Sequence, residues 1–216
     1  MNFDEIAGRY DSWYRTEFGR YAHNLERELI MYFARPAKGE KILDVGCGTG
    51  TYGLEFAKMG LDVTCLDMSR GMLRVAKTKS RDLGIILGDA KEMPFRDNTF
   101  DLIVGITLIE FLNKPEKAIQ EMKRVLRGDG RLILGVLNKF SLSALYERIT
   151  GNETYASARF YSIFELKKFG VKRWDSTLFA FKKMPGFLLD WFMKSDRILS
   201  KIFKPFGAFL VVEVEK

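Results

Sequence analysis

The chain has 216 residues, of which 47% are hydrophobic and 29% are charged, a composition typical of a folded globular domain. No apolar run approaches the roughly 20 residues that cross a bilayer, and the opening MNFDEIAGRYD lacks the pattern of a signal peptide. Two cysteines, Cys47 and Cys65, exclude a disulfide framework, and the single histidine, His23, excludes a histidine-rich metal cluster. We therefore expect a cytoplasmic protein that carries no metal.

The charge is unevenly distributed along the chain. Residues 1–113 hold 15 basic and 17 acidic side chains, whereas residues 114–216 hold 20 basic and 11 acidic ones. A positive second half suits an anionic substrate, a membrane surface or a nucleic acid. Because the basic residues are spread out and not clustered, we expect them to lie on solvated helix faces.

Helices and strands alternate in the first two thirds of the chain. We expect an amphipathic helix over 20–34, a strand over 41–45, a helix over 51–59, a strand over 62–66, a helix from Ser69 to about 81, and strands over 85–88 and 100–106. Asn113, Pro115 and Glu116 predict a capped helix that ends at Gly128, before a strand in RLILGVLN. This alternation predicts an α/β fold with a doubly wound, mostly parallel sheet.

The alternation stops after residue 138. Residues 139–170 are aromatic and helical in tendency, 172–179 is a candidate strand, and AFLVVEVEK predicts a last strand. The segment 187–204 is amphipathic, with Leu188, Trp191, Phe192, Ile198, Leu199 and Ile202 opposed to four basic residues. We expect this helix to pack its apolar face on the sheet; the alternative is a surface helix in contact with anionic lipid.

The segment ILDVGCGTG at 42–50 is the strongest local signal. An apolar strand ends in Asp44, and the chain then turns through Gly46, Gly48 and Gly50 into a helix. Glycine is needed where the backbone takes positive φ or lies against a ligand. A strand, a glycine turn and a helix start predict a ligand crevice at the carboxyl end of a parallel sheet.

Three carboxylates follow the predicted strands in phase. Asp44, Asp67 and Asp89 are 23 and 22 residues apart, about one strand–helix unit each, which places them along one edge of the sheet. Asp67 stands where a nucleoside-binding fold presents an acid to the ribose hydroxyls. Asp89, followed by Ala90, could accept a hydrogen bond from an adenine amino group. The crevice is therefore predicted to bind a nucleoside.

The glycine spacing narrows the choice of nucleoside cofactor. The pattern is Gly-x-Gly-x-Gly, not the Gly-x-Gly-x-x-Gly that receives the pyrophosphate of a dinucleotide. The acid at the start of the loop, Asp44, suits a ligand with cationic groups, and S-adenosylmethionine (SAM) carries an ammonium and a sulfonium. SAM is therefore the predicted cofactor, with S-adenosylhomocysteine as product, and a nicotinamide dehydrogenase is disfavoured.

The sequence resembles a class I SAM-dependent methyltransferase of the type-11 or ubiquinone-methyltransferase-like group. The stretches that carry the resemblance are FDEIAGRYDSWY at 3–14, ILDVGCGTG at 42–50, LDMSRGML at 66–73, GDAKEMPF at 88–95, FDLIVGITLIEFL at 100–112 and RVLRGDGRLIL at 124–134. It covers about residues 3–138. The resemblance implies a Rossmann-like, seven-stranded sheet with an antiparallel last strand.

The resemblance also implies a set of cofactor-binding residues. These are Asp44, Gly46, Cys47, Gly48, Asp67, Met68, Asp89, Ala90, Thr107 and Tyr14. The loop residues would line the amino-acid end of SAM, Asp67 would hold the ribose, and Met68, Asp89 and Ala90 would surround the adenine. Thr107 would face the methyl group, and Tyr14 would belong to a lid.

Four segments follow from this reading. Residues 1–36 would form an N-terminal helical lid, 37–138 the SAM-binding core, 139–171 a helical insertion on the substrate side, and 172–216 the final strands and amphipathic helix that complete the same domain. The predicted substrate-side residues are Tyr10, Tyr155, Arg159 and Tyr161.

Methyl transfer from a sulfonium is an in-line displacement that requires mainly positioning and exclusion of water. If the acceptor needs a general base, the candidate catalytic residue is Glu110, just beyond the fourth predicted strand; Asp11 and His23 are alternatives.

The acceptor is expected to be a small molecule. Enzymes of this superfamily that methylate base amino groups carry an Asn/Asp-Pro-Pro-aromatic run where this chain has GITLIEFL, and no Pro-Cys pair occurs. Nucleic acid is therefore an unlikely partner, and membrane contact is not expected. An RNA methyltransferase and a non-catalytic SAM-binding module stay open as alternatives, and the sequence does not indicate an oligomeric state.

Overall fold

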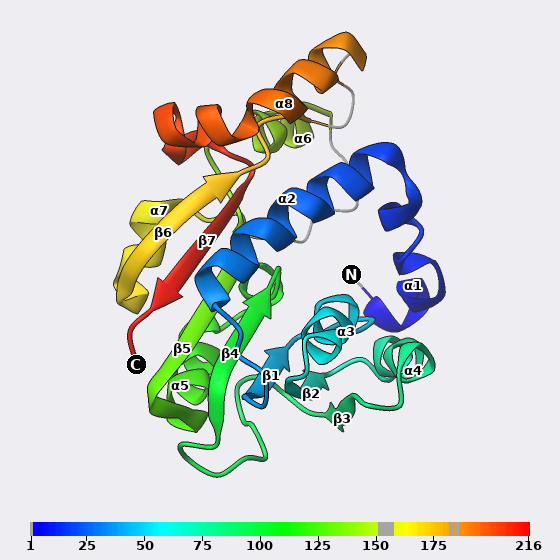
Figure 1. The fold of residues 1–216 in the computed structure, drawn as a ribbon, viewed down its shortest axis with the longest axis vertical. Coiled ribbons are helices and arrows are strands. Elements are labelled where there is room, and N and C mark those ends of the chain that lie inside the picture. The colour runs from blue at the N-terminus through cyan, green and yellow to red at the C-terminus, as the bar shows by residue number, and fades with distance from the viewer. Residues whose placement is uncertain (1, 151–157, 182–183, 185) are drawn as a thin grey trace.

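The computed structural model describes residues 2–150, 158–181, 184 and 186–216, and a seven-stranded sheet forms its centre (Figure 1). The strands are β1 (Lys41–Val45), β2 (Asp62–Asp67), β3 (Gly84–Leu87), β4 (Phe100–Ile106), β5 (Leu126–Leu137), β6 (Val171–Thr177) and β7 (Phe209–Val214). Their order in the sheet is β3-β2-β1-β4-β5-β7-β6, and β7 runs antiparallel to both of its neighbours. The predicted fold class, with its antiparallel last strand, is confirmed.

Helices flank the sheet on both faces. In chain order they are α1 (Phe3–Tyr10), α2 (Glu17–Ala34), α3 (Thr51–Lys58), α4 (Arg70–Lys79), α5 (Pro115–Val125), α6 (Leu142–Thr150), α7 (Ile163–Leu166) and α8 (Gly186–Ile202). Short 3-10 turns are η1 (Trp13–Arg15), η2 (Ile109–Phe111), η4 (Lys167–Phe169) and η5 (Lys204–Phe206). Figure 1 shows α2 crossing one face of the sheet, with α5 and α7 behind it.

The central strands are buried on both faces, as expected for parallel strands covered by helices. Successive side chains of a strand point to opposite faces, so Ile42 joins the core beneath α2 and α3, whereas Leu43 joins the core beneath α5 and α7. Both side chains are fully buried. This two-sided burial explains why the strands read as continuous apolar runs.

Local capping follows the sequence in one helix and departs from it in another. The Ser69 side chain accepts a hydrogen bond from the Met72 amide and caps α4, as predicted. By contrast, α5 begins at Pro115 with Lys114 as its N-cap, so the predicted cap at Asn113 is wrong. The helix also ends at Val125, before the predicted Gly128, because β5 already pairs with β4 at Leu126.

Helix α8 lies over the end of β6 and is turned differently from the prediction. Leu189 and Phe192 face inward onto a small apolar cluster that includes Tyr21 and Leu178. Four of the apolar residues expected on the inner face are instead exposed: Leu188, Trp191, Ile198 and Ile202. The expectation that one apolar face packs on the sheet is therefore only half correct.

No helix within the described part of the chain is both long enough and apolar enough to cross a membrane.

Candidate functional site

A small cavity lies where the carboxyl ends of β1 and β4 meet the glycine loop. Its volume is about 40 Å³. Its lining residues are Tyr10, Tyr14, Asp44, Gly46, Cys47, Gly48, Thr49, Thr51, Tyr52, Ile106 and Thr107. Seven of the residues singled out in the sequence thus meet around one space, although they come from three separate segments of the chain.

The glycine loop is folded back onto the end of β2. The amides of Gly46 and Cys47 both donate to the Leu66 carbonyl, at 2.7 and 3.2 Å. Gly46 and Gly48 take φ values of 69° and 54°, which favour glycine. A Cβ on Gly46 would lie 2.6 Å from Leu108 Cδ1, whereas a Cβ on Gly48 would meet nothing within 4 Å. The backbone at Gly48 is therefore open to a ligand.

Asp67 ties the end of β2 to this loop. Its Oδ2 accepts from the Gly48 amide and its Oδ1 from the Ser69 amide, each at 2.8 Å. Burial raises the pKa of Asp67, and these amide hydrogen bonds oppose the rise. A carboxylate has about four lone-pair sites, so both oxygens can still accept from ligand hydroxyls. The residue can organise the loop and hold a sugar at the same time.

Asp44 places a nearly inaccessible carboxylate on the cavity wall. It is 2% exposed, and its Oδ2 has no hydrogen-bond partner among the described residues. Burial, with the negative charge of Asp67 as the second cause, raises the pKa of Asp44 to about 7. An unpaired carboxylate in such a place is costly. A cationic ligand group in the cavity would remove that cost.

Thr107 is held in an unusual backbone conformation at the end of β4. Its φ is 47°, a genuine outlier for a β-branched residue. Its amide donates to the Gly135 carbonyl at 2.8 Å, which fixes the peptide beside the cavity. Strain of this kind costs about 1–3 kcal/mol and concentrates at functional sites, so the conformation supports a role for the Thr107 backbone.

Three further predicted residues lie beside the cavity and not in its wall. Leu87 of β3 pairs with Asp67, and this register brings the β3–β4 loop next to the end of β2. Asp89 is exposed and accepts from the Lys91 amide at 2.9 Å, with an ion pair to the Lys91 ammonium at 3.3 Å. Ala90 is buried, whereas Met68 is 71% exposed. These residues form an edge next to the glycine loop.

Helix α1 and η1, residues 3–15, close over the glycine loop and are called the lid below. At one end, Asp4 accepts from the Ser69 hydroxyl at 2.7 Å and from the Gly71 amide at 2.5 Å. At the other end, Asp11 accepts from the Thr49 hydroxyl at 2.6 Å and pairs with the Lys79 ammonium at 2.7 Å. Two acidic contacts therefore fasten the lid.

Sequence reasoning missed this fastening. Asp4 and Asp11 are seven residues apart, about two helical turns, which was the only local signal available. Helix α2, which the predicted lid of residues 1–36 includes, contributes Ile30, Phe33 and Ala34 to the core on the sheet.

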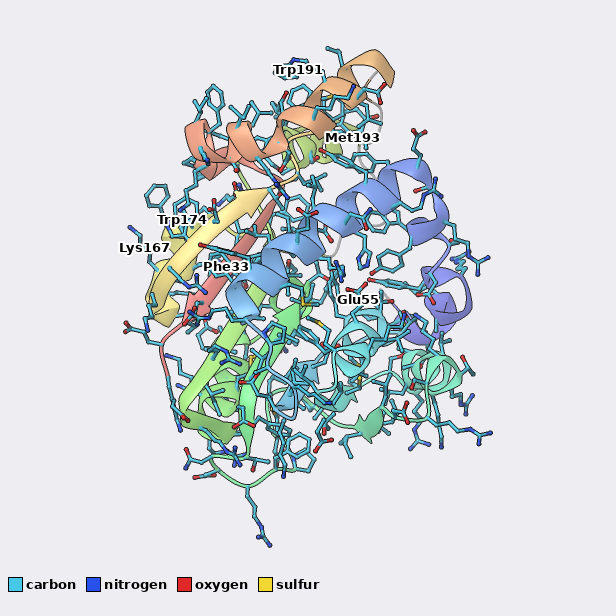
Figure 2. The ribbon with its side chains drawn as sticks, in the orientation of Figure 1. Phe33, Glu55, Lys167, Trp174, Trp191 and Met193 are labelled. Atoms are coloured by element: carbon cyan, nitrogen blue, oxygen red, sulfur yellow. The ribbon has the colours of Figure 1, made fainter. Side chains whose placement is uncertain are left out.

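A polar cluster joins α2 to α3 behind the cavity. His23 Nε2 lies 3.1 Å from Glu55 Oε1, and Arg27 also binds Glu55. The rings of Tyr14 and Tyr52 pack on His23, at centroid distances of 5.0 and 5.2 Å. Figure 2 shows Glu55 between the two helices. His23 is thus enclosed by side chains of its neighbours.

Comparisons with known proteins agree with this geometry. Residues 43–134 match the protein family described as a methyltransferase domain. A demethylmenaquinone methyltransferase of Renibacterium salmoninarum is 37% identical over 132 residues, which are 61% of this chain and 55% of that protein. An uncharacterized protein of Methanocaldococcus jannaschii is 32% identical over 98% of this chain and 99% of its own length.

A solved methyltransferase structure shares the fold of the whole chain. A SAM-dependent methyltransferase of Thermotoga maritima, a possible histamine N-methyltransferase, superposes with a TM-score of 0.75 at 24% identity, over 99% of this chain and 98% of that chain. Residues 43–134 therefore form a methyltransferase domain, and the whole chain has the fold of a SAM-dependent methyltransferase. SAM is the cofactor of this methyltransferase, and S-adenosylhomocysteine is the product. The match to the demethylmenaquinone enzyme spans only about half of that enzyme's length.

The residues of the site fit SAM in their chemistry. The unpaired Oδ2 of Asp44 suits the ammonium, and the free lone pairs of Asp67 suit ribose hydroxyls. The cavity of about 40 Å³ has room for only a few water molecules, whereas small-molecule sites measure roughly 300–1,000 Å³. The cavity is therefore far smaller than a small-molecule site, and the lid residues Tyr10 and Tyr14 form part of its wall.

The structure corrects the prediction for the catalytic residue. Glu110 is 2% exposed, its Oε1 accepts from the Leu137 amide at 2.7 Å, and its Oε2 has no partner among the described residues. Burial raises the pKa of Glu110 to about 8. Because the carboxyl is enclosed and absent from the cavity wall, the structure does not place Glu110 where a general base would meet an acceptor.

The substrate-side predictions are corrected in part. Tyr161 is fully buried, and its hydroxyl donates to the Ile109 carbonyl at 3.4 Å, so it belongs to the core and cannot face an acceptor. Arg159 is exposed and lies over the Tyr161 ring, with its side chain turned toward Glu165. Tyr155 lies outside the described residues. Of the three described residues, only Tyr10 lines the cavity.

Proposed function

We propose that this methyltransferase transfers the methyl group of SAM to a small-molecule acceptor by in-line displacement. The observation that carries the proposal is the convergence of two strand-end carboxylates, Asp44 and Asp67, on an open glycine backbone. This arrangement offers one acid to a cation and another to a sugar. Membership of the methyltransferase family supports the assignment.

Each residue then has a part in binding SAM. Asp44 would pair with the ammonium, Asp67 would accept from the ribose hydroxyls, and the backbone of Gly46 to Gly48 would lie along the amino-acid end. Asp89, Ala90 and Met68 would surround the adenine at the neighbouring sheet edge. Thr107 would fix the peptide that faces the methyl group, since its strained conformation is the last feature of β4 before the cavity.

The lid would supply the rest of the rate enhancement. Displacement at a sulfonium requires a nucleophile aligned about 3 Å from the methyl carbon and the exclusion of water. Tyr10 lines the cavity, and burial raises the pKa of its phenol to about 12, so it stays neutral and can donate a hydrogen bond. We propose that the lid opens for SAM and closes on the acceptor.

Among the described residues, neither Glu110 nor Asp11 is free to act as a base, which restricts the acceptor. Glu110 is enclosed, and the Asp11 carboxylate is already bound to Thr49 and Lys79. The acceptor should therefore bring a nucleophile that is available near neutral pH, such as an amine, or an enolic or phenolic group that ionises readily. A quinone-like aromatic is the first acceptor to test, because one relative is named for demethylmenaquinone. Two free cysteines are consistent with our further proposal that the enzyme works in the cytoplasm.

The proposal is tested by incubating the protein with methyl-labelled SAM and extracts of metabolites, lipids and RNA. We expect label in a small-molecule fraction with wild type and loss of that label with Asp67→Ala. Asp62→Ala is the matched control, because Asp62 lies at the opposite end of the same strand. Label in the RNA fraction would instead identify RNA as the acceptor and contradict the proposed small molecule. Tight binding of S-adenosylhomocysteine without transfer to any fraction would instead indicate a non-catalytic SAM-binding module.

A further inference from the structure

The outer face of α8 carries a row of large apolar side chains. Leu188, Trp191, Ile198 and Ile202 are 37%, 54%, 61% and 66% exposed. Their spacings of three, seven and four residues place them on one side of a helix, and we call them the α8 stripe. Figure 2 shows Trp191 on the outer side of α8, whereas Met193 lies on the side toward α2.

The α8 stripe is larger than the scattered apolar exposure of ordinary surfaces. Two more exposed apolar residues, Phe203 and Phe206, follow the helix in the sequence and are 49% and 51% exposed. Single exposed apolar residues need no explanation, but contiguous patches of them mark interaction sites. No described residue of the chain covers this row.

The stripe cannot be hidden by rotation of the helix. Asp196, on the inner face of α8, is 3% exposed. It accepts from the Thr177 hydroxyl at 2.6 Å and from the amides of Leu178 and Phe179 at 3.0 and 3.1 Å. A roll that buried Ile198 would expose these three donors and break all three bonds. The outward direction of the stripe is thus fixed by polar contacts beneath it.

Basic residues border the stripe. Lys194 and Lys201 lie two helical turns apart on one flank, and Arg197 lies farther round on the same side. Lys194 and Lys201 form no ion pair with a described acidic residue, whereas Arg197 pairs with Glu28 at 3.2 Å. Asp190 is the only exposed acid of the helix, because Asp196 is buried. The border therefore carries a net positive charge.

We propose that the α8 stripe docks on an anionic lipid surface. The helix would lie in the plane of the interface, with the stripe at the boundary of the acyl chains and the two free lysines among the phosphates. Charge complementarity favours this occupant over a second copy of the chain. Pairing two stripes would bring four lysines of like sign together with only two exposed aspartates to offset them.

The position of α8 gives the contact a use. The helix follows the carboxyl end of β6, and α6 follows the carboxyl end of β5, so both lie at the edge of the sheet that holds the cavity (Figure 1). A bilayer under α8 would thus lie on the cavity side of the molecule. The docking itself does not depend on the acceptor proposed above.

Flotation with lipid vesicles tests the docking. Vesicles of phosphatidylcholine are compared with vesicles that also contain about 30% phosphatidylglycerol, a fraction sufficient to attract polybasic segments. Wild type should float with the anionic vesicles only. The double variant Ile198→Ser with Ile202→Ser should bind at least about tenfold more weakly, since each buried methylene contributes to partitioning. Lys194→Gln with Lys201→Gln should lose about fivefold per lysine.

Matched measurements separate docking from folding and from catalysis. Tyr32→Ser removes an apolar side chain of similar exposure, 66%, from α2 and should float like wild type. All variants should melt near the wild-type temperature and bind S-adenosylhomocysteine normally, because the changed side chains are exposed and lie outside the cavity wall.

The proposal is overturned if wild type stays with the soluble fraction, or if the stripe variant floats as wild type does. It is also overturned if sedimentation shows that wild type is a dimer and the stripe variant is a monomer, since a second copy would then occupy the face. A failure of methyl transfer would leave each of these results unchanged, so the two proposals fail separately.

Discussion

Replacement of Asp67 by asparagine tests the assignment of the ribose site most directly. The side chain keeps its size, but one carboxylate oxygen becomes an NH₂ group. In wild type both oxygens accept backbone amides, from Gly48 and from Ser69. The variant can accept a hydrogen bond from only one of these amides, so both the glycine loop and the bound cofactor lose a charged acceptor.

The substitution is expected to lower two separate free energies, that of unfolding and that of cofactor binding. Hydrogen bonds to charged groups contribute about 1.5–3 kcal/mol each, and an unsatisfied buried donor costs about 1–3 kcal/mol. The unpaired Gly48 amide should lower the free energy of unfolding by about 1 kcal/mol, because Asp67 is only partly buried. A ribose hydroxyl that loses its charged acceptor should weaken cofactor binding by about 2 kcal/mol, or roughly 30-fold in Kd.

Titration calorimetry with two ligands separates the direct contact from the loop effect. S-adenosylhomocysteine and its 2′-deoxyribose analogue are each titrated into wild type and Asp67→Asn. If Asp67 holds the ribose, loss of the hydroxyl should weaken binding to wild type by at least about 1 kcal/mol and should hardly change binding to the variant. Asp62→Asn, at the exposed start of β2, should behave as wild type.

Equal losses of affinity in the two proteins would refute a direct contact between Asp67 and the ribose. If both proteins lose the same affinity with the deoxy ligand, Asp67 acts on binding only through the loop, and the ribose must be held elsewhere. Unchanged affinity of Asp67→Asn for S-adenosylhomocysteine would remove the residue from the site altogether.

Three further outcomes are expected. Burial raises the pKa of Glu110 in the folded protein to about 8, so the contribution of its protonated form to the free energy of unfolding is complete below the unfolded value of 4.5 and is lost as pH rises through 8. Urea unfolding between pH 5 and 8 should therefore show wild type losing up to about 1.4 kcal/mol per pH unit relative to Glu110→Gln, and parallel pH profiles would contradict the buried assignment. Asp11→Asn removes the partly exposed ion pair with Lys79, which contributes about 1 kcal/mol, so stopped-flow measurements should show S-adenosylhomocysteine both binding and dissociating about fivefold faster. The control Glu116→Gln breaks an ion pair away from the lid and should change neither rate. Asp196→Ala leaves three donors at the end of β6 unpaired and should lower the free energy of unfolding by about 3 kcal/mol in chemical denaturation, a loss that Asp190→Ala should not show.

The elements and residues that the sequence predicted correctly are those whose signals are local. The strand β4 was placed at its observed bounds because an apolar run with flanking turns needs no distant information. Asp44 and Asp67 were predicted at one edge because a parallel sheet repeats about every 23 residues and brings strand ends together. Local periodicity therefore predicts which residues converge, though not what surrounds them.

The misjudged residues depend on partners far along the chain. Glu110 was predicted as a base from its place after β4, but burial raises its pKa, and its Oε1 accepts from the Leu137 amide, 27 residues away. Tyr161 was predicted to meet the acceptor, but its hydroxyl finds the Ile109 carbonyl 52 residues earlier and its ring enters the core. Neither burial nor these carbonyl and amide partners leave a trace in the neighbouring sequence.

The orientation of α8 shows that a single carboxylate can decide which side of a helix faces inward. Helical periodicity gives this segment two rows of apolar residues, one with Phe192 and one with Ile198 and Ile202, and hydrophobicity alone does not choose between them. Asp196 lies in the row with Phe192. A buried carboxylate is costly unless it is fully bonded, and the end of β6 offers three donors at hydrogen-bonding distance. Bonding these donors stabilises the row with Asp196 inside and leaves the other row in solvent. The exposed stripe is thus a consequence of a polar anchor, and it would persist whether or not a lipid surface covers it.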